Sequence, residues 1–242
     1  AIPYEHEFTL IGTTDVPYHP SDGPAKISQD EIDYLLSAAN EYFDAPITQG
    51  DIVSDYSGVR PLYDDKAKSA SEVTRDYVLE VDEFAKGAPF LSVFGGKITT
   101  SRKLAEHALQ KLEDYFTYSQ LDWTAKASLP GGDIQGADFE SFFKSLSSKY
   151  PKFNSGILYR MARCYGTKTR DMIGDAQTLE AMGRNFGGGL TQREADYLVK
   201  EEFATRAEDI LNRRTKLALH MGPSQIAAFT NWFKQEHGHG HG

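Results

Sequence analysis

The pattern of apolar and polar positions in the first hundred residues predicts a mixture of strands and helices. Residues 8–14 are rich in β-branched and apolar side chains, and we expect residues 1–4 to pair with them across a three-residue turn. Residues 28–31 (Ser-Gln-Asp-Glu) form a capping box, and an apolar stripe at helical spacing follows up to residue 43. Further strands are predicted at 51–62, 76–81 and 90–94.

The pattern changes to a helical period near residue 100. A helix is predicted over 100–116, and residues 124–136, with one proline and three glycines, are taken as a linker. Beyond the linker no strand is expected, and helices are predicted at 138–149, 153–164, 169–182, 191–202, 206–219 and 223–236. The expected fold is α+β in residues 1–123, then an all-α domain in 137–236 and a disordered tail in 237–242.

Composition narrows the class of protein. The chain has 242 residues, of which 40% are apolar and 25% charged, as is ordinary for a soluble globular protein. Its net charge of -9 argues against nucleic acid as a partner. Cys164 is the single cysteine, so no internal disulfide can form, which suits a reducing compartment. We expect no structural or catalytic metal site, and no apolar run approaches the roughly 20 residues that a membrane-spanning helix needs.

The junction at residues 94–103 carries the clearest chemical signal. A strand ends, Gly95 and Gly96 allow a close turn, and a helix is expected to begin at Thr99 or Thr100. A helix start presents unpaired N–H groups, and Lys97 adds a full positive charge, so an anion would be held there. The anion could be a phosphate or the N1–C2=O edge of a reduced flavin. The alternative is a simple connecting turn with Lys97 in solvent.

Two arginines suggest a second anion site. Residues 55–62 and 74–77 each place an arginine, Arg60 and Arg75, in a strand-like segment. If the two strands pair in antiparallel fashion, these arginines lie opposite each other on one face, which is unfavourable unless an anion sits between them. A phosphate dianion can use two arginines. Alternatively, each arginine pairs with a nearby acid at the surface, the candidates being Asp64, Asp65 and Asp76.

Several motifs resemble a known family. Those before the linker are residues 11–15 (Ile-Gly-Thr-Thr-Asp), 56–62 (Tyr-Ser-Gly-Val-Arg-Pro-Leu), 74–76 (Thr-Arg-Asp), 91–97 (Leu-Ser-Val-Phe-Gly-Gly-Lys) and 99–106. In order and spacing they resemble the FAD-dependent glycerol-3-phosphate dehydrogenases, and residues 186–190 and 208–217 resemble that family's helical carboxy-terminal domain. The resemblance implies the carboxy-terminal half of such an enzyme, with an antiparallel substrate sheet and part of an FAD domain of the amino acid oxidase type.

The resemblance also implies roles for the two sites. Arg60 and Arg75 would bind the substrate phosphate, and the residues beside the flavin of FAD would be Gly95, Gly96, Lys97, Ile98, Thr99 and Thr100. The reaction would be oxidation of sn-glycerol 3-phosphate to dihydroxyacetone phosphate by hydride transfer to FAD, with electrons passed to quinone. A cytoplasmic enzyme attached peripherally to the inner membrane is expected, and a homodimer is left open.

The sequence departs from the family pattern in ways that limit these expectations. The glycine-rich nucleotide-binding loop of the family's amino-terminal half is not found, and the histidine proposed there as general base would lie upstream of residue 1. Residues 187–189 lack the loop's spacing and are interpreted as a helix end and loop. Ser101 stands where relatives often have tyrosine. No catalytic residue is therefore assigned, and we expect the chain to be inactive alone. The alternatives are a non-catalytic module that binds anions or a partner, and an oxidase that uses oxygen.

Overall fold

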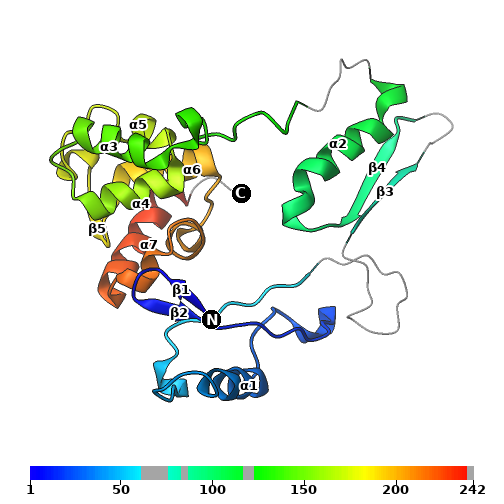
Figure 1. The fold of residues 1–242 in the computed structure, drawn as a ribbon, viewed down its shortest axis with the longest axis horizontal. Helices are drawn as coiled ribbons and strands as arrows, with labels where there is room; N and C mark the ends of the chain where they lie inside the picture. The colour runs from blue at the N-terminus through cyan, green and yellow to red at the C-terminus, as the bar shows by residue number, and fades with distance from the viewer. Residues whose placement is uncertain (61–75, 83–86, 117–122, 239–242) are drawn as a thin grey trace. The chain divides into compact units, whose positions relative to one another are not determined.

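The computed structural model describes residues 1–60, 76–82, 87–116 and 123–238, and its folding pattern is α+β (Figure 1). The chain divides into two compact units, Ala1–Ala127 and Ser128–Gly242, here called unit 1 and unit 2.

Unit 1 begins with the predicted hairpin. Strand β1 (Ile2–Tyr4) pairs in antiparallel fashion with β2 (Phe8–Leu10), and helix α1 (Gln29–Asn40) follows a short 3₁₀ turn. The predicted capping box is confirmed: the hydroxyl of Ser28 accepts from the Glu31 N–H at 3.3 Å, and the Glu31 carboxylate accepts from the Ser28 N–H at 2.9 Å. These reciprocal bonds pair N–H groups that a helix start otherwise leaves open. The 3₁₀ turns here are Pro20–Asp22 and Gln49–Asp51.

A second hairpin forms the other part of unit 1. Strand β3 (Tyr77–Asp82) pairs in antiparallel fashion with β4 (Phe90–Gly95), a 3₁₀ turn (Ile98–Thr100) follows, and helix α2 (Ser101–Lys111) packs against β3. Figure 1 shows α2 along this hairpin. The helix predicted over 100–116 is shorter in the structure: α2 ends at Lys111, and a further 3₁₀ turn follows at Glu113–Tyr115.

The predicted strand at 51–62 is wrong for its described part. Residues 52–60 have no regular secondary structure, and β3 pairs with β4. The reason lies in the cross-strand partners: β4 offers a nearly continuous apolar run to the apolar positions of β3. Residues 52–60 instead contain Gly58, which weakens a strand, and several polar residues.

Unit 2 is mainly helical. Its longer helices begin at polar caps: the side chains of Asp138, Asn154 and Thr191 accept N–H bonds from the first turns of α3, α4 and α6. Helix α7 has proline at its first position, where no N–H is needed. The elements are α3 (Phe139–Lys149), α4 (Ser155–Tyr165), α5 (Lys168–Ile173), α6 (Gln192–Glu202), a π-helix (Asp209–Arg214), α7 (Pro223–His237) and 3₁₀ turns at Gln135–Ala137, Glu180–Met182 and Leu217–His220.

The expectation of an all-α second domain is wrong in one detail. Strands β5 (Asn185–Gly187) and β6 (Leu190–Thr191) form a short antiparallel hairpin, so the interpretation of residues 187–189 as a helix end was also wrong. The three glycines have φ of +105°, +58° and +80°, a conformation that favours glycine. The predicted helix 169–182 ends at Gly174, which has φ of +59°. The predicted helix 206–219 is a π-helix and a 3₁₀ turn.

The two units differ sharply in burial. Unit 2 contains the hydrophobic core, whose fully buried side chains include Leu146, Leu158, Met161, Ile173, Leu190, Leu198, Ile210 and Phe229. Among the described residues of unit 1, Glu106 alone is buried. The described helices are all too short or too polar to cross a membrane.

Candidate functional site

The junction between β4 and α2 has the close turn that the sequence predicts. Gly95 and Gly96 have φ of +69° and +100°. A side chain at Gly96 would place its Cβ 3.2 Å from Leu104 Cδ1 and 3.2 Å from Tyr77 Cβ. Glycine is therefore required here for two reasons: the backbone is left-handed, and the turn is packed between β3 and α2.

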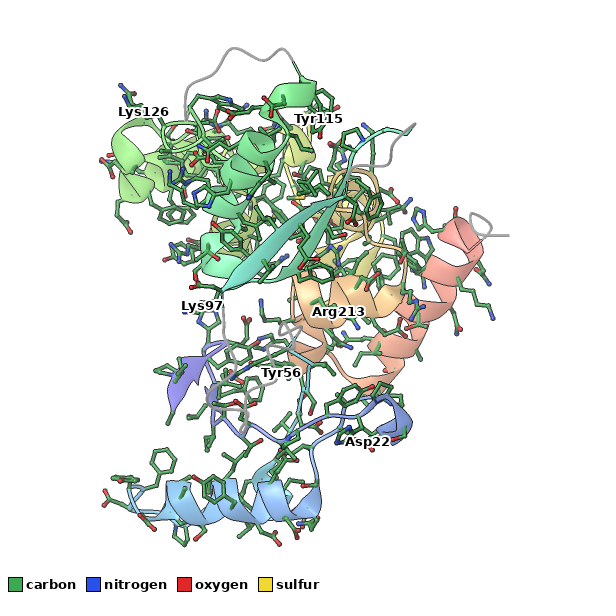
Figure 2. The ribbon with its side chains drawn as sticks, turned by 90° about the vertical axis from the view of Figure 1, so that its right-hand side faces the viewer. Asp22, Tyr56, Lys97, Tyr115, Lys126 and Arg213 are labelled. Atoms are coloured by element: carbon green, nitrogen blue, oxygen red, sulfur yellow. The ribbon has the colours of Figure 1, made fainter. Side chains whose placement is uncertain are left out.

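The residues after the glycines present donors at the surface. The carbonyl of Lys97 accepts from the Thr100 N–H at 3.0 Å and from the Thr100 hydroxyl at 2.9 Å, which closes the turn leading into α2. Lys97, Ile98 and Thr99 are exposed, and Lys97 forms no ion pair with any described residue. Figure 2 shows Lys97 at the end of the hairpin where α2 begins. An ammonium beside the open N–H groups of a helix start fits an anionic group, including the polar edge of a reduced flavin.

Arg60 is held by an acid that the sequence interpretation did not name. Its Nη1 lies 2.9 Å from Asp15 Oδ2, and both side chains are about half exposed. Such a surface ion pair contributes only about 0–1 kcal/mol, so it can be exchanged for a stronger anion. Arg75, Asp64 and Asp65 lie outside the described residues. The juxtaposition of Arg60 and Arg75 therefore stays a prediction.

A chain of hydrogen bonds positions the acid that pairs with Arg60. Thr14, next to Asp15, donates its hydroxyl to Glu31 at 2.5 Å, and Glu31 is also the acceptor of the capping box with Ser28. The bond from Thr14, followed by those from Ser28, lowers the pKa of Glu31. Residues 14 and 15 are thereby attached to the start of α1, so Arg60 is tied through Asp15 to a capped helix.

Two contacts that sequence reasoning missed hold α2 in place. The hydroxyl of Tyr77 is hydrogen-bonded to Nδ1 of His107. Glu106 accepts from Arg102 at 2.7 Å, from Lys103 at 2.6 Å and from the hydroxyl of Thr124. The bond from Lys103, then that from Thr124, lowers the pKa of Glu106 to about 2. The partners of Tyr77 and Thr124 lie 30 and 18 residues away, so no local pattern reveals these contacts.

Unit 2 contains a buried polar cluster that the sequence analysis did not find. Glu194 is fully buried and accepts from Arg160 Nη1 at 2.6 Å, from Arg160 Nη2 at 2.8 Å and from the Tyr165 hydroxyl at 2.6 Å. Burial alone would lower the pKa of Arg160, but the charge of Glu194 raises it above its usual range. Burial, followed by that charge, raises the pKa of Tyr165. The cluster joins α4 to α6 and has the character of a structural tie.

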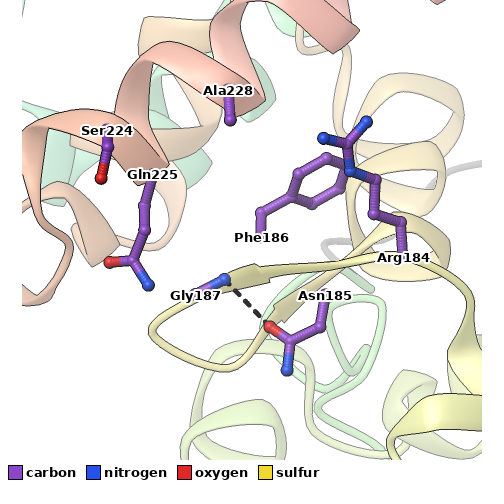
Figure 3. Close-up of a pocket in the computed structure, with 7 residues that line it drawn as sticks. All are labelled: Arg184, Asn185, Phe186, Gly187, Ser224, Gln225 and Ala228. Carbon is purple, nitrogen blue, oxygen red and sulfur yellow. Dashed lines mark hydrogen bonds between the residues drawn. The ribbon is translucent and has the colours of Figure 1, made fainter.

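Two surface depressions are formed by unit 2. One of about 520 Å³ lies between the β5 strand and α7, where the Asn185 side chain accepts from the Gly187 N–H at 2.9 Å (Figure 3). The other, of about 450 Å³, lies between α5 and α6. Neither is lined by Arg60 or by any residue of the junction. A second polar side chain of the first depression also serves the fold, since Gln225 accepts from the Gly222 N–H at 2.9 Å.

Comparison with known proteins gives a consistent result for both units. Residues 1–102 match the FAD dependent oxidoreductase family, and residues 123–234 match the C-terminal domain of alpha-glycerophosphate oxidase. The chain is 46% identical to a D-erythritol 1-phosphate dehydrogenase of Brucella abortus, over 96% of this chain and 46% of that protein. It is 43% identical to a glycerol-3-phosphate dehydrogenase of Pseudomonas aeruginosa, over 99% of this chain and 46% of the relative. An aerobic glycerol-3-phosphate dehydrogenase of Escherichia coli is 42% identical, over 96% of this chain and 46% of that protein. The chain thus spans about half the length of these relatives.

Proposed function

Because this chain belongs to the FAD-dependent oxidoreductases that carry the C-terminal domain of alpha-glycerophosphate oxidase, we propose that it forms the carboxy-terminal half of an FAD-dependent glycerol-3-phosphate dehydrogenase. The complete enzyme oxidises sn-glycerol 3-phosphate to dihydroxyacetone phosphate, and FAD, when bound, accepts the hydride. The observation that supports this proposal is that both units match, in the same order, relatives named glycerol-3-phosphate dehydrogenase. In this proposal residues 1–123 belong to the FAD and substrate domain, 124–136 are a linker, 137–236 form the mainly helical domain and 237–242 are a tail.

The flavin contacts are proposed at the junction. Gly95 and Gly96 bring the backbone close, while Lys97 and the turn Ile98–Thr100 offer an ammonium, backbone N–H groups and hydroxyls. These donors suit the N1–C2=O edge, which gains negative charge on reduction. In the complete enzyme, Lys97→Met is expected to make the flavin reduction potential more negative, which a spectroelectrochemical titration measures. An unchanged potential would contradict the assignment.

The phosphate contacts are proposed at Arg60 and Arg75. The Arg60 guanidinium has further N–H donors besides the one paired with Asp15, so a phosphate dianion can replace or join that carboxylate. In the complete enzyme, Arg60→Ala and Arg75→Ala should each raise KM for glycerol 3-phosphate at least tenfold and affect the slow oxidation of unphosphorylated glycerol far less. Arg213→Ala is the matched control, because the Arg213 side chain is also exposed and also forms an ion pair, at 2.8 Å with Asp209. Equal losses for both substrates would rule out a phosphate role.

A second substrate is supported by the relative from Brucella abortus, whose name specifies D-erythritol 1-phosphate. Both named substrates are phosphorylated polyols, so the same arginines would serve either. Comparing kcat/KM for the two substrates on one enzyme preparation distinguishes them. A preference of tenfold or more for D-erythritol 1-phosphate would replace glycerol 3-phosphate in the proposal.

We propose that the electron acceptor is quinone and that the enzyme is cytoplasmic and peripheral on the inner membrane. A homodimer stays open, and sedimentation of the complete protein measures the oligomeric state. Substrate-dependent reduction of a soluble quinone without oxygen consumption is the expected result. Oxygen consumption at a comparable rate would instead identify an oxidase. If the complete protein binds no FAD, measured as flavin absorbance, the chain is a non-catalytic binding module.

A further inference from the structure

The motif at residues 11–15 has no role in the function proposed so far. Its last residue, Asp15, forms the ion pair with Arg60, between Asp15 Oδ2 and Arg60 Nη1 at 2.9 Å, although the two residues are 45 positions apart. A carboxylate beside a guanidinium that binds phosphate has one of two roles. It competes with the phosphate, or it orients the guanidinium for the phosphate, and the two roles change substrate affinity in opposite directions.

The motif is anchored to a capped helix. The Thr14 hydroxyl donates to Glu31 Oε1 at 2.5 Å, while Oε2 of the same carboxylate accepts from the Ser28 N–H and the Ser28 hydroxyl, both at 2.9 Å. The bond from Thr14, followed by those from Ser28, lowers the pKa of Glu31 and keeps it ionised. Residue 14 is therefore held at the start of α1, and Asp15 is positioned by groups other than Arg60.

Arg60 lies in a segment that does not orient its side chain. Residues 52–60 have no helix or strand, so no regular backbone hydrogen bonds hold this stretch. The Arg60 side chain is also about half exposed. A long side chain with such freedom loses conformational entropy when a ligand fixes it. Among the residues that the structure describes, the partner that restricts the guanidinium is Asp15.

The ion pair uses one corner of the guanidinium. Asp15 contacts Nη1, whereas Nε and Nη2 lie along a different edge of the same rigid plane. Two parallel N–H bonds from one such edge are a common arrangement for phosphate. Asp15 and a phosphate can therefore bind Arg60 together. The charge of Asp15 opposes a dianion, but both side chains are about half exposed, so solvent weakens that repulsion.

We propose that Asp15 is a positioning residue for the substrate phosphate. It holds Arg60 at Nη1, so that the Nε–Nη2 edge is already oriented when the phosphate arrives. Such preorganisation reduces the entropy lost on binding, so Asp15 acts on the affinity for the phosphorylated substrate and not on hydride transfer. The inference rests on the proposed function, which supplies Arg60 as a phosphate ligand, and extends it to a residue that does not itself contact the substrate.

The first test is the kinetics of the complete protein. Asp15→Asn keeps the size of the side chain and removes its charge. It should raise KM for glycerol 3-phosphate by about three- to fivefold, the upper part of the range for an exposed ion pair, and leave kcat within about twofold. Asp15→Glu restores the carboxylate and should lie closer to the unmodified protein. The control is Asp175→Asn, at an exposed ion pair of unit 2 with Arg193 at 3.1 Å, and it should change neither constant.

A double-mutant cycle shows whether Asp15 acts through Arg60. In the Arg60→Ala protein, Asp15→Asn should change KM by less than about 1.5-fold, because no guanidinium is left to orient. The same cycle is measured for inorganic phosphate by calorimetry, which needs no turnover, and its dissociation constants should follow the same pattern. Circular dichroism of each variant should show the same helix content, which excludes general misfolding.

Three results would overturn the proposal. A fall of KM with Asp15→Asn shows that the carboxylate competes with the phosphate, an unchanged KM shows that it has no role in affinity, and an equal rise in the Arg60→Ala protein shows a general structural effect.

Inorganic phosphate separates this inference from the function. If the protein binds phosphate through Arg60 and Asp15 but does not oxidise glycerol 3-phosphate, the inference is supported and the function is contradicted. If the protein oxidises glycerol 3-phosphate with a KM that depends on Arg60 but not on Asp15, the function is supported and the inference is contradicted.

Discussion

The buried cluster around Glu194 leads to the sharpest prediction about stability. Glu194→Ala removes the carboxylate that pairs with both terminal nitrogens of Arg160 and with the hydroxyl of Tyr165. The Glu194 side chain is fully buried, and the Arg160 side chain is only 16% exposed. The variant therefore leaves a buried guanidinium and a buried hydroxyl without their acceptor.

The size of the effect follows from that burial. Breaking a buried ion pair by removing one partner destabilises a protein by about 3–5 kcal/mol, because the remaining charge is uncompensated. For a domain of about 100 residues, 1 kcal/mol shifts Tm by roughly 4–8 °C, so the Tm of unit 2 should fall by roughly 12–40 °C. The control is Asp175→Ala, which removes an exposed ion pair with Arg193 at 3.1 Å and should cost no more than about 1 kcal/mol.

The assay is urea denaturation of the whole chain, followed by tryptophan fluorescence, since Trp232 is in the core of unit 2. A second variant, Arg160→Met/Glu194→Leu, separates lost charge from lost shape. It should be more stable than Glu194→Ala because no unpaired charge remains buried. The reasoning is refuted if Glu194→Ala lies within 1 kcal/mol of the Asp175→Ala control, or if the double variant is less stable than the single one.

Three further measurements test other parts of the structure. Gly166→Ala should destabilise unit 2 by more than about 3 kcal/mol in urea denaturation, because the added Cβ would lie 1.9 Å from the carbonyl oxygen of Gly131. The control is Gly136→Ala: Gly136 also has a positive φ, but an added Cβ would meet no atom within 4 Å, so the cost should be only about 1–2 kcal/mol. The pKa of Glu106 in the folded protein lies below its value in the unfolded chain. The stabilisation from the ionised Glu106 carboxylate is therefore fully present above about pH 4.5 and is lost as the pH falls through about 2. A carboxyl NMR titration should show that midpoint, and Lys103→Met should raise it; a midpoint near 4.5 in the unmodified chain would contradict the contacts. If Lys97 contacts the flavin as we propose, Lys97→Met should lower the flavin potential of the complete protein by on the order of 30 mV, equivalent to about 1.4 kcal/mol for two electrons, and Lys97→Arg should largely retain it.

The sequence by itself determined the features that depend on near neighbours. The hairpin of residues 2–10, the capping box at Ser28 and the glycine turn at residues 95–96 all form through bonds or dihedral preferences within a few residues. Most helix positions in unit 2 were predictable for the same reason, since polar caps and apolar periodicity act locally.

Only the tertiary structure decided which distant groups meet. Arg60 selects Asp15 across 45 residues, and Glu194 turns from its own helix start to Arg160, 34 residues away. Strand β3 likewise pairs with β4 and not with the segment that holds Arg60, because the apolar run of β4 supplies better cross-strand partners. These pairings depend on burial and packing, because in the folded chain every available partner competes for the same group. A local sequence pattern does not describe that competition.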